Sequence, residues 1–96
     1  MPGAGEEIAA EYYVEFITRD DCPLCAKGEL VLRSVARRWG LDVRLLNVDE
    51  DAALFEEFSE RVPVVRSAGG AVITEGRISA LRLNAALMKR RMSQLG

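Results

Sequence analysis

The stretch from residue 12 to residue 48 restricts the possible folds of this chain more than any other. Residues 12–18 are rich in β-branched and aromatic side chains, which predicts a strand buried largely on both faces. Residues 23–39 repeat apolar side chains at helical spacing, and residues 43–48 (VRLLNV) form a second strand-like run. A strand, a helix and a strand in this order predict two parallel strands joined by a right-handed crossover. Glu15 interrupts the first run, and we expect it near an exposed end of the strand rather than as a proton relay.

The predicted helix has clear start and stop signals. Pro23 suits a first helical position, where its missing N–H is not needed, and Gly40 suits the residue after the last turn. One apolar stripe runs along the helix and contains Cys25, Gly28, Leu32, Val35, Ala36 and Trp39. We therefore expect Cys25 to lean toward the core and Cys22 to stay at the exposed tip.

The second half of the chain alternates between shorter elements. Residues 49–51 (DED) can cap a short helix that carries Leu54, Phe55 and Phe58. Residues 62–66, which open at a proline, and residues 71–74 predict an antiparallel hairpin around the turn at residues 67–70 (SAGG). Ser79 can cap a final helix over residues 80–92, whose buried stripe is predicted to contain Leu83, Leu87 and Met88.

These elements predict an α/β protein in the order β-α-β-α-β-β-α, with a four-stranded mixed sheet and helices on both faces. The 96 residues suffice for one domain. We expect residues 1–10 to be a disordered lead and residues 11–96 to form the single domain.

The only two cysteines, Cys22 and Cys25, stand at the start of the first helix. A thiol there lies beside unpaired backbone N–H groups and the positive end of the helix dipole, and both favour the thiolate that attacks disulfides. Arg19 and Lys27 are the nearby cations, whereas Asp20 and Asp21 oppose a thiolate. We expect a modestly lowered pKa for Cys22 and a raised pKa for Cys25.

Composition excludes several other functions. The net charge is −2 and the sequence pI is about 5.2, so nothing favours nucleic-acid binding, and residues 89–91 (KRR) are expected to be a solvated final helix turn. No apolar run approaches the ~20 residues that span a bilayer, and no basic region precedes an apolar one, so neither a membrane role nor a secretory signal is expected. Two cysteines are too few for a disulfide-dense secreted scaffold, so a cytoplasmic protein is expected. The absence of histidine removes Cys–His and Ser–His pairs and the usual zinc ligand.

The motif CPLC at residues 22–25, the element order and the proline that opens the third strand resemble the thioredoxin fold over about residues 12–87. The closer resemblance is to glutaredoxins, because the motif begins Cys-Pro with an apolar third residue. Asp21 stands where thioredoxins carry a tryptophan, and Phe16 where they carry a buried acid. More narrowly, CPLC together with RVPV at residues 61–64 is similar to small bacterial glutaredoxin-like proteins.

The resemblance implies a disulfide reductase that acts on protein disulfides or glutathione mixed disulfides. Cys22 would attack the substrate and Cys25 would resolve the mixed disulfide. Pro63 would be cis and pack against the motif, leaving the Val62 N–H and C=O free for an extended substrate backbone. The partners implied are a disulfide-bearing protein or a low-molecular-weight thiol and a reductant, either glutathione or a thioredoxin reductase. We expect a monomer.

Glutathione is implied as a co-substrate, with no tightly bound cofactor. Arg19 and Lys27 match the basic side of the family's glutathione site, next to Pro23 and Leu24 of the motif. The family's second glycine-rich segment is not matched, but Gly76 and Arg77 stand in its place and offer an N–H group and a charge to a carboxylate. Glu75 beside them would repel one.

Two alternatives from other classes remain open. Two cysteines cannot fill a zinc or iron–sulfur site, but a dimer could pool two pairs or add glutathione thiols. The chain could also be a binding module of thioredoxin architecture without turnover. Cys22 and Cys25 as mere apolar filler fit poorly, since two aspartates and a proline adjoin Cys22.

Overall fold

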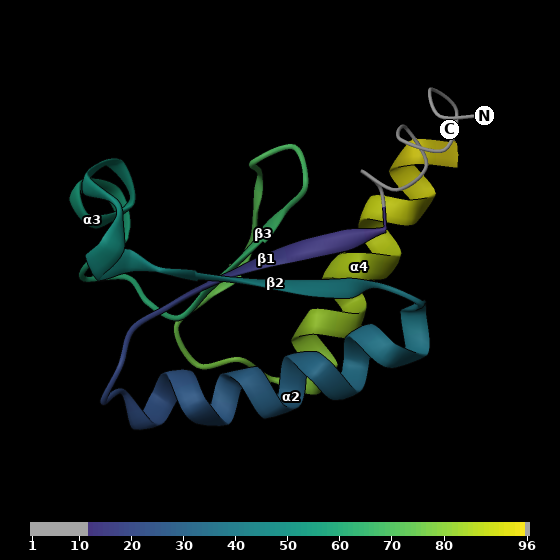
Figure 1. The fold of residues 1–96 in the computed structure, drawn as a ribbon. Coiled ribbons are helices and arrows are strands. Elements are labelled where there is room, and N and C mark those ends of the chain that lie inside the picture. Colours follow the sequence, from purple (N-terminus) through teal and green to yellow (C-terminus); the bar gives the residue numbers. More distant parts are fainter. Residues whose placement is uncertain (1–11, 96) are drawn as a thin grey trace.

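The computed structural model describes residues 12–95, which contain one four-stranded sheet (Figure 1). The strands are β1 (Tyr13–Thr18), β2 (Asp42–Asn47), β3 (Val64–Ser67) and β4 (Val72–Glu75), in the order β2-β1-β3-β4. β1 pairs parallel with β2 and antiparallel with β3, and β3 pairs antiparallel with β4. The predicted mixed sheet is therefore confirmed, while the predicted lead at residues 1–10 lies outside the described residues.

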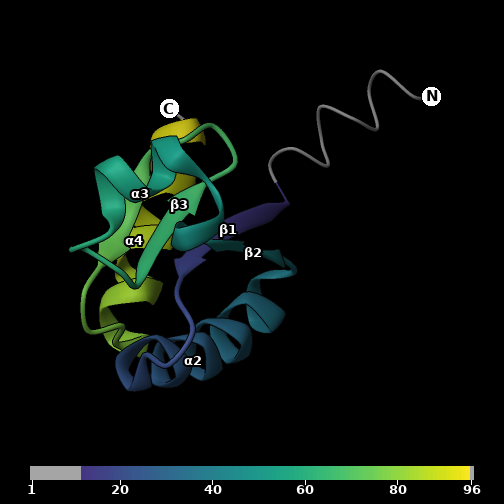
Figure 2. The same ribbon diagram turned by 60° about the vertical axis from the view of Figure 1, so that its left-hand side comes forward.

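Helices cover both faces of the sheet, as predicted. Helices α2 (Pro23–Trp39) and α4 (Ala80–Leu95) lie on one face, and α3 (Ala52–Phe58) lies on the other after a 3-10 turn, η1 (Val48–Glu50) (Figures 1 and 2). Alternation along β1 produces these layers, because neighbouring residues of a strand point to opposite faces. Phe16 packs in the cluster of α2 and α4, whereas Ile17 packs with Phe58 of α3.

Local signals set the ends of α2. Cys22 is the N-cap and Pro23 the first helical residue, and Gly40 ends the helix with a left-handed φ of 70°. The predicted stripe is buried, and Trp39 is partly buried at its end. The absence of a side chain at Gly28 allows α2 to lie close to Ile78, in the segment that precedes α4. A Cβ added at Gly28 would lie only 2.9 Å from Ile78 Cγ1.

The final helix departs from the prediction in two ways. Ser79 Oγ does accept the Arg82 N–H at 3.1 Å, and Leu83 and Leu87 are buried. Met88 is half exposed, so its predicted burial is wrong: it lies about 100° around the helix from Leu87 and points away from the core that Leu83 and Leu87 enter. The helix continues to Leu95, so the basic run at residues 89–91 is not its last turn. The guanidinium of Arg91 lies 4.8 Å from the centre of the Trp39 ring.

Glu15 also differs from the prediction. It lies in the middle of β1, directly opposite Arg66 of β3, and the two side chains pair at 2.8 Å while each is about one fifth exposed. The expected position near an exposed strand end is therefore wrong. A cross-strand partner, which comes 51 residues later, makes the half-buried position favourable for a carboxylate.

Candidate dithiol active site

Cys22 and Cys25 are joined by a disulfide at the start of α2, with their Cα atoms 5.1 Å apart. Cys22 Sγ caps the helix and accepts the Cys25 N–H at 3.1 Å. Cys25 is 1% exposed, whereas Cys22 is only partly buried. This arrangement confirms the prediction that Cys22 lies at the exposed tip of the helix and that Cys25 leans toward the core. Of the two sulfurs, the Cys22 sulfur is therefore the more accessible from solvent.

The two residues between the cysteines lie on the surface. Pro23 is exposed and Leu24 is 41% exposed, so Leu24 presents an apolar side chain beside the reachable sulfur. Lys27, on the next turn of α2, is exposed, and within residues 12–95 it forms no ion pair. These three positions agree with a surface that a substrate can contact.

A second segment of the predicted site surrounds Pro63. The Val62–Pro63 peptide bond is cis, Pro63 is fully buried, and its carbonyl oxygen accepts the Gly76 N–H at 2.8 Å. Gly76 has a φ of 76°, a left-handed conformation that favours glycine. Pro63 and Gly76 are thus brought together, and the Gly76 N–H is not available to a carboxylate. Arg77, the next residue, is exposed.

The expectation that both backbone groups of Val62 stand free is wrong for the N–H. It donates to Phe58 O at 3.1 Å, because the chain leaves α3 in a turn in which Arg61 N also bonds to that oxygen. The Val62 C=O has no hydrogen-bond donor among the described residues. Only the carbonyl therefore remains to pair with a substrate backbone.

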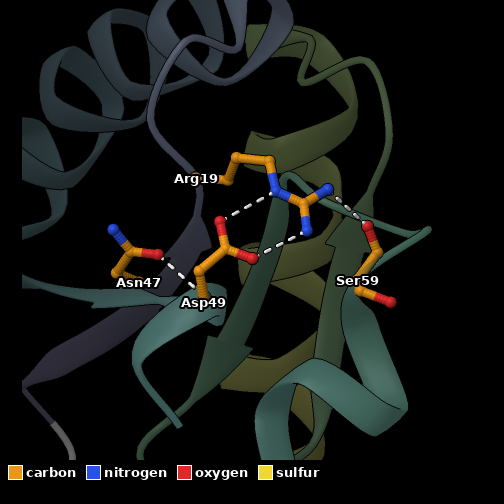
Figure 3. A network of polar contacts seen from close by, with 4 residues as sticks. All are labelled: Arg19, Asn47, Asp49 and Ser59. Atoms are coloured by element: carbon orange, nitrogen blue, oxygen red, sulfur yellow. Dashed lines mark hydrogen bonds and ion pairs between the residues drawn. The ribbon is translucent and has the colours of Figure 1, made fainter.

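Arg19 is engaged with other parts of the chain (Figure 3). Its Nε donates to Asp49 Oδ2 at 3.1 Å, its Nη2 donates to Asp49 Oδ1 at 2.9 Å, and its Nη1 donates to the Ser59 carbonyl at 2.9 Å. The hydrogen bonds lower the pKa of Asp49 and raise that of Arg19, against a smaller opposing effect of desolvation. The Asp49 N–H in turn donates to Asn47 Oδ1 at 2.8 Å.

A second bidentate pair lies beside the Pro63 segment. Arg61 donates to Glu75 from Nη2 at 2.7 Å and from Nε at 3.2 Å, and its guanidinium lies 4.7 Å from the centre of the Phe58 ring. These hydrogen bonds are the main cause of the lowered pKa of Glu75. The repulsion that we expect from Glu75 toward a carboxylate is therefore offset by Arg61.

Asp49, Ser59 and Arg61 are absent from the site residues predicted above. The position of Asp49 near Arg19 could have been predicted from the sequence. In the parallel pair β1–β2, Thr18 lies opposite Asn47, so the residues that follow the two strands lie close together at the same end of the sheet. No comparable signal places the Ser59 carbonyl, whose position depends on the packing of α3. Among residues 12–95, no group of three or more His, Cys, Asp or Glu side chains is arranged to hold a metal ion.

A dithiol at the first strand–helix junction, next to a four-stranded mixed sheet, defines a glutaredoxin-like protein of the thioredoxin superfamily. Residues 13–91 match the model of the Glutaredoxin-like domain (DUF836), and the chain belongs to this family. No curated protein matches the chain. None of the helices within residues 12–95 is both long and apolar enough to cross a membrane.

Solved structures agree with this assignment. The chain is similar to the X-ray structure of a structural genomics target, XcR50, from X. campestris, with a TM-score of 0.68 and 30% identity over 79% of this chain and 96% of that one. It also resembles thioredoxin 1 from Thermosipho africanus, with a TM-score of 0.67 and 15% identity over 88% of this chain and 99% of that one. At that identity the likeness to thioredoxin 1 shows the shared fold alone.

Proposed function

We propose that this protein is a thiol–disulfide oxidoreductase that reduces protein disulfides or glutathione mixed disulfides through Cys22 and Cys25. The observation that carries the proposal is the disulfide at the start of α2, with one reachable sulfur and one buried sulfur. Two sulfurs within one helical turn can bond and separate without a change in the fold. The helix N-terminus and the Cys25 N–H favour the thiolate of Cys22 in the reduced form.

The reaction proceeds in two steps. The Cys22 thiolate attacks one sulfur of the substrate disulfide, forming a mixed disulfide and releasing the first substrate thiolate, which takes up a proton. The Cys25 thiol, after losing its proton, attacks Cys22 Sγ, which releases the second substrate thiol and forms the Cys22–Cys25 bond. Two electrons thus pass from the cysteine pair to the substrate. A reductant, such as two monothiols or a thioredoxin reductase, then supplies two electrons that reduce the Cys22–Cys25 disulfide again.

The remaining site residues have supporting roles in this proposal. Leu24 and Pro23 contact the substrate beside the sulfur, the Val62 carbonyl accepts from its backbone, and Lys27 and Arg77 offer exposed positive charge. Glutathione serves as a co-substrate rather than a bound cofactor. We place the activity in the cytoplasm, where dithiols are kept reduced, and assign it to the monomer.

A reduction assay with single-cysteine variants tests the proposal. It offers a protein disulfide and a glutathione mixed disulfide, with glutathione or a thioredoxin reductase as the electron source. Cys22→Ser should abolish turnover of both substrates, because serine keeps an N-cap oxygen but cannot form the mixed disulfide. Cys25→Ser should abolish reduction of the protein disulfide and retain that of the mixed disulfide, which glutathione can resolve. Full activity of the Cys22→Ser variant would refute the assignment, and absence of turnover in the wild type would indicate a binding module instead.

A further inference from the structure

Arg19 lies close to Cys22 in the chain. It is three residues before Cys22, so their Cα atoms are at most about 11 Å apart even in an extended chain. A disulfide substrate extends beyond its reacting sulfur. A charged group of a substrate held at Cys22 can therefore come close to Arg19, within the Debye length of about 10 Å at 0.1 M salt.

Asp49 occupies the side of Arg19 that would otherwise bind an anion. Both oxygens of this carboxylate accept from the guanidinium, and the Ser59 carbonyl accepts from the third nitrogen. The Asp49 carboxylate comes from a neighbouring strand end, 30 residues later, and its backbone is held by Asn47 Oδ1. A substrate carboxylate would have to displace this bidentate partner to reach Arg19 (Figure 3).

The other unpaired charges of the site are of both signs. Asp20 and Asp21 are exposed and, within the described part of the chain, form no ion pair. Lys27 and Arg77 balance these two charges, and Arg19 and Asp49 offset each other. With Arg19 paired, the site therefore keeps no excess of positive charge that would favour an anion.

We propose that Asp49 is a specificity-determining residue: by pairing with Arg19 it removes the positive charge that would make the dithiol prefer anionic disulfides, such as oxidised glutathione, over neutral and cationic ones. This inference rests on the proposed function and adds the charge class of its substrates. Asp49 acts through Arg19 and does not touch the reacting sulfurs. Its substitution should accordingly change the choice between substrates more than the reactivity of Cys22.

The test uses reduced protein and three small disulfides that differ in charge: oxidised glutathione, which is doubly negative, neutral bis(2-hydroxyethyl) disulfide and doubly positive cystamine. The second-order rate constant for oxidation of the protein is measured by trapping free thiols with a maleimide at timed intervals. Each constant is divided by that of dithiothreitol with the same disulfide, which removes differences in intrinsic reactivity. We expect the wild type to show no preference for oxidised glutathione over the other two disulfides at low salt, where the effect of charge is largest.

Three variants separate the effect of Arg19 from that of net charge. Asp49→Asn frees Arg19, and Glu50→Gln makes the same change of charge at the adjacent residue, which does not bond to Arg19. We expect Asp49→Asn to raise the ratio of the glutathione to the cystamine constant about three- to fivefold, because the freed guanidinium can pair directly with a carboxylate of oxidised glutathione, whereas a change of net charge alone acts through screened solvent. Glu50→Gln should change it less than twofold. The double variant Arg19→Gln/Asp49→Asn should lose the gain.

Equal effects of Asp49→Asn and Glu50→Gln, or a gain that survives in the double variant, would overturn the inference while leaving the proposed function intact. Circular dichroism of each variant shows whether the fold is kept, and the constant for the neutral disulfide shows whether the dithiol still reacts. If the wild type is oxidised by none of the three disulfides, the proposed function fails and the inference falls with it.

Discussion

At the scale of single residues, Cys22 combines a structural role with the chemical role that we propose for it. Its sulfur occupies the position at which a serine or aspartate usually caps a helix, and it accepts the Cys25 N–H. The hydrogen bond that starts α2 is therefore the same bond that stabilises negative charge on the sulfur. The same position can therefore serve both the fold and the proposed reaction.

The cap predicts the reactivity of Cys22. In the reduced protein, iodoacetamide should alkylate Cys22 with a pH midpoint below the value of about 8.5 for a free thiol, because the helix start favours the thiolate. Cys25 should react much more slowly, since it is buried. Mass spectrometry after timed quenching distinguishes the two sites. A synthetic peptide of residues 19–27 is the control, and a Cys22 midpoint equal to that of the peptide would contradict the prediction.

At the scale of elements, the packing of α2 against the segment before α4 depends on Gly28. Gly28→Ala would gain about 1 kcal/mol of helix propensity. The new Cβ would meet Ile78 Cγ1 at 2.9 Å and the Phe16 ring at 3.4 Å, and overpacking of this kind costs about 1–3 kcal/mol. We expect a net loss of about 1 kcal/mol in the free energy of unfolding, measured in urea.

A double-mutant cycle checks the cause of that loss. In an Ile78→Ala background the atom at 2.9 Å is gone, so Gly28→Ala should become neutral or stabilising through its helix propensity. Equal losses in both backgrounds would show that contact with Ile78 is not the reason for glycine at this position.

At the scale of the whole molecule, two bidentate arginine–carboxylate pairs connect segments that are distant in sequence. Arg19 joins the end of β1 to η1 through Asp49 and to the end of α3 through Ser59, and Arg61 joins the end of α3 to β4 through Glu75. Both pairs are well exposed to solvent, so each contributes little to stability and is screened by salt. Their effect should be visible mainly in the acid range.

The pH dependence of stability follows from the lowered pKa values of Asp49 and Glu75. A carboxyl group with a lower pKa in the folded than in the unfolded state stabilises the fold above its unfolded pKa of about 4 and loses this effect as the pH falls through its folded pKa. The double variant Asp49→Asn/Glu75→Gln should therefore lose less stability than the wild type between about pH 5 and pH 3. Urea unfolding at each pH measures this difference.

The matched control for that experiment is Glu50→Gln/Glu56→Gln, which removes the same charge from residues that form no ion pair within residues 12–95. It should follow the wild-type curve in shape. If both double variants flatten the curve equally, net charge rather than the two arginine pairs is responsible.

Local interactions explain which predictions from the sequence are confirmed. Pro23 and Gly40 set the limits of α2, Ser79 caps α4, and the alternation in β1 divides the core into two layers. Each of these signals acts within one turn or between adjacent residues, so it can be read without knowing the rest of the fold. The prediction for Met88 fails because one residue turns the helix by about 100°, which takes Met88 away from the direction of Leu87, and the sequence alone does not give the width of the buried face.

The sequence by itself determined the order of the elements, the mixed sheet and the position of Cys22 and Cys25 at the start of a helix, because propensity, capping and periodicity are local properties. Only the tertiary structure decided that Arg19 is paired with Asp49 and that Glu15 faces Arg66. The ion pairs join residues 30 and 51 positions apart, and such partners are fixed by strand register and helix packing rather than by any neighbour in the chain. The architecture around the dithiol was therefore readable from local chemistry, whereas the charge that a substrate meets there depends on the folded chain.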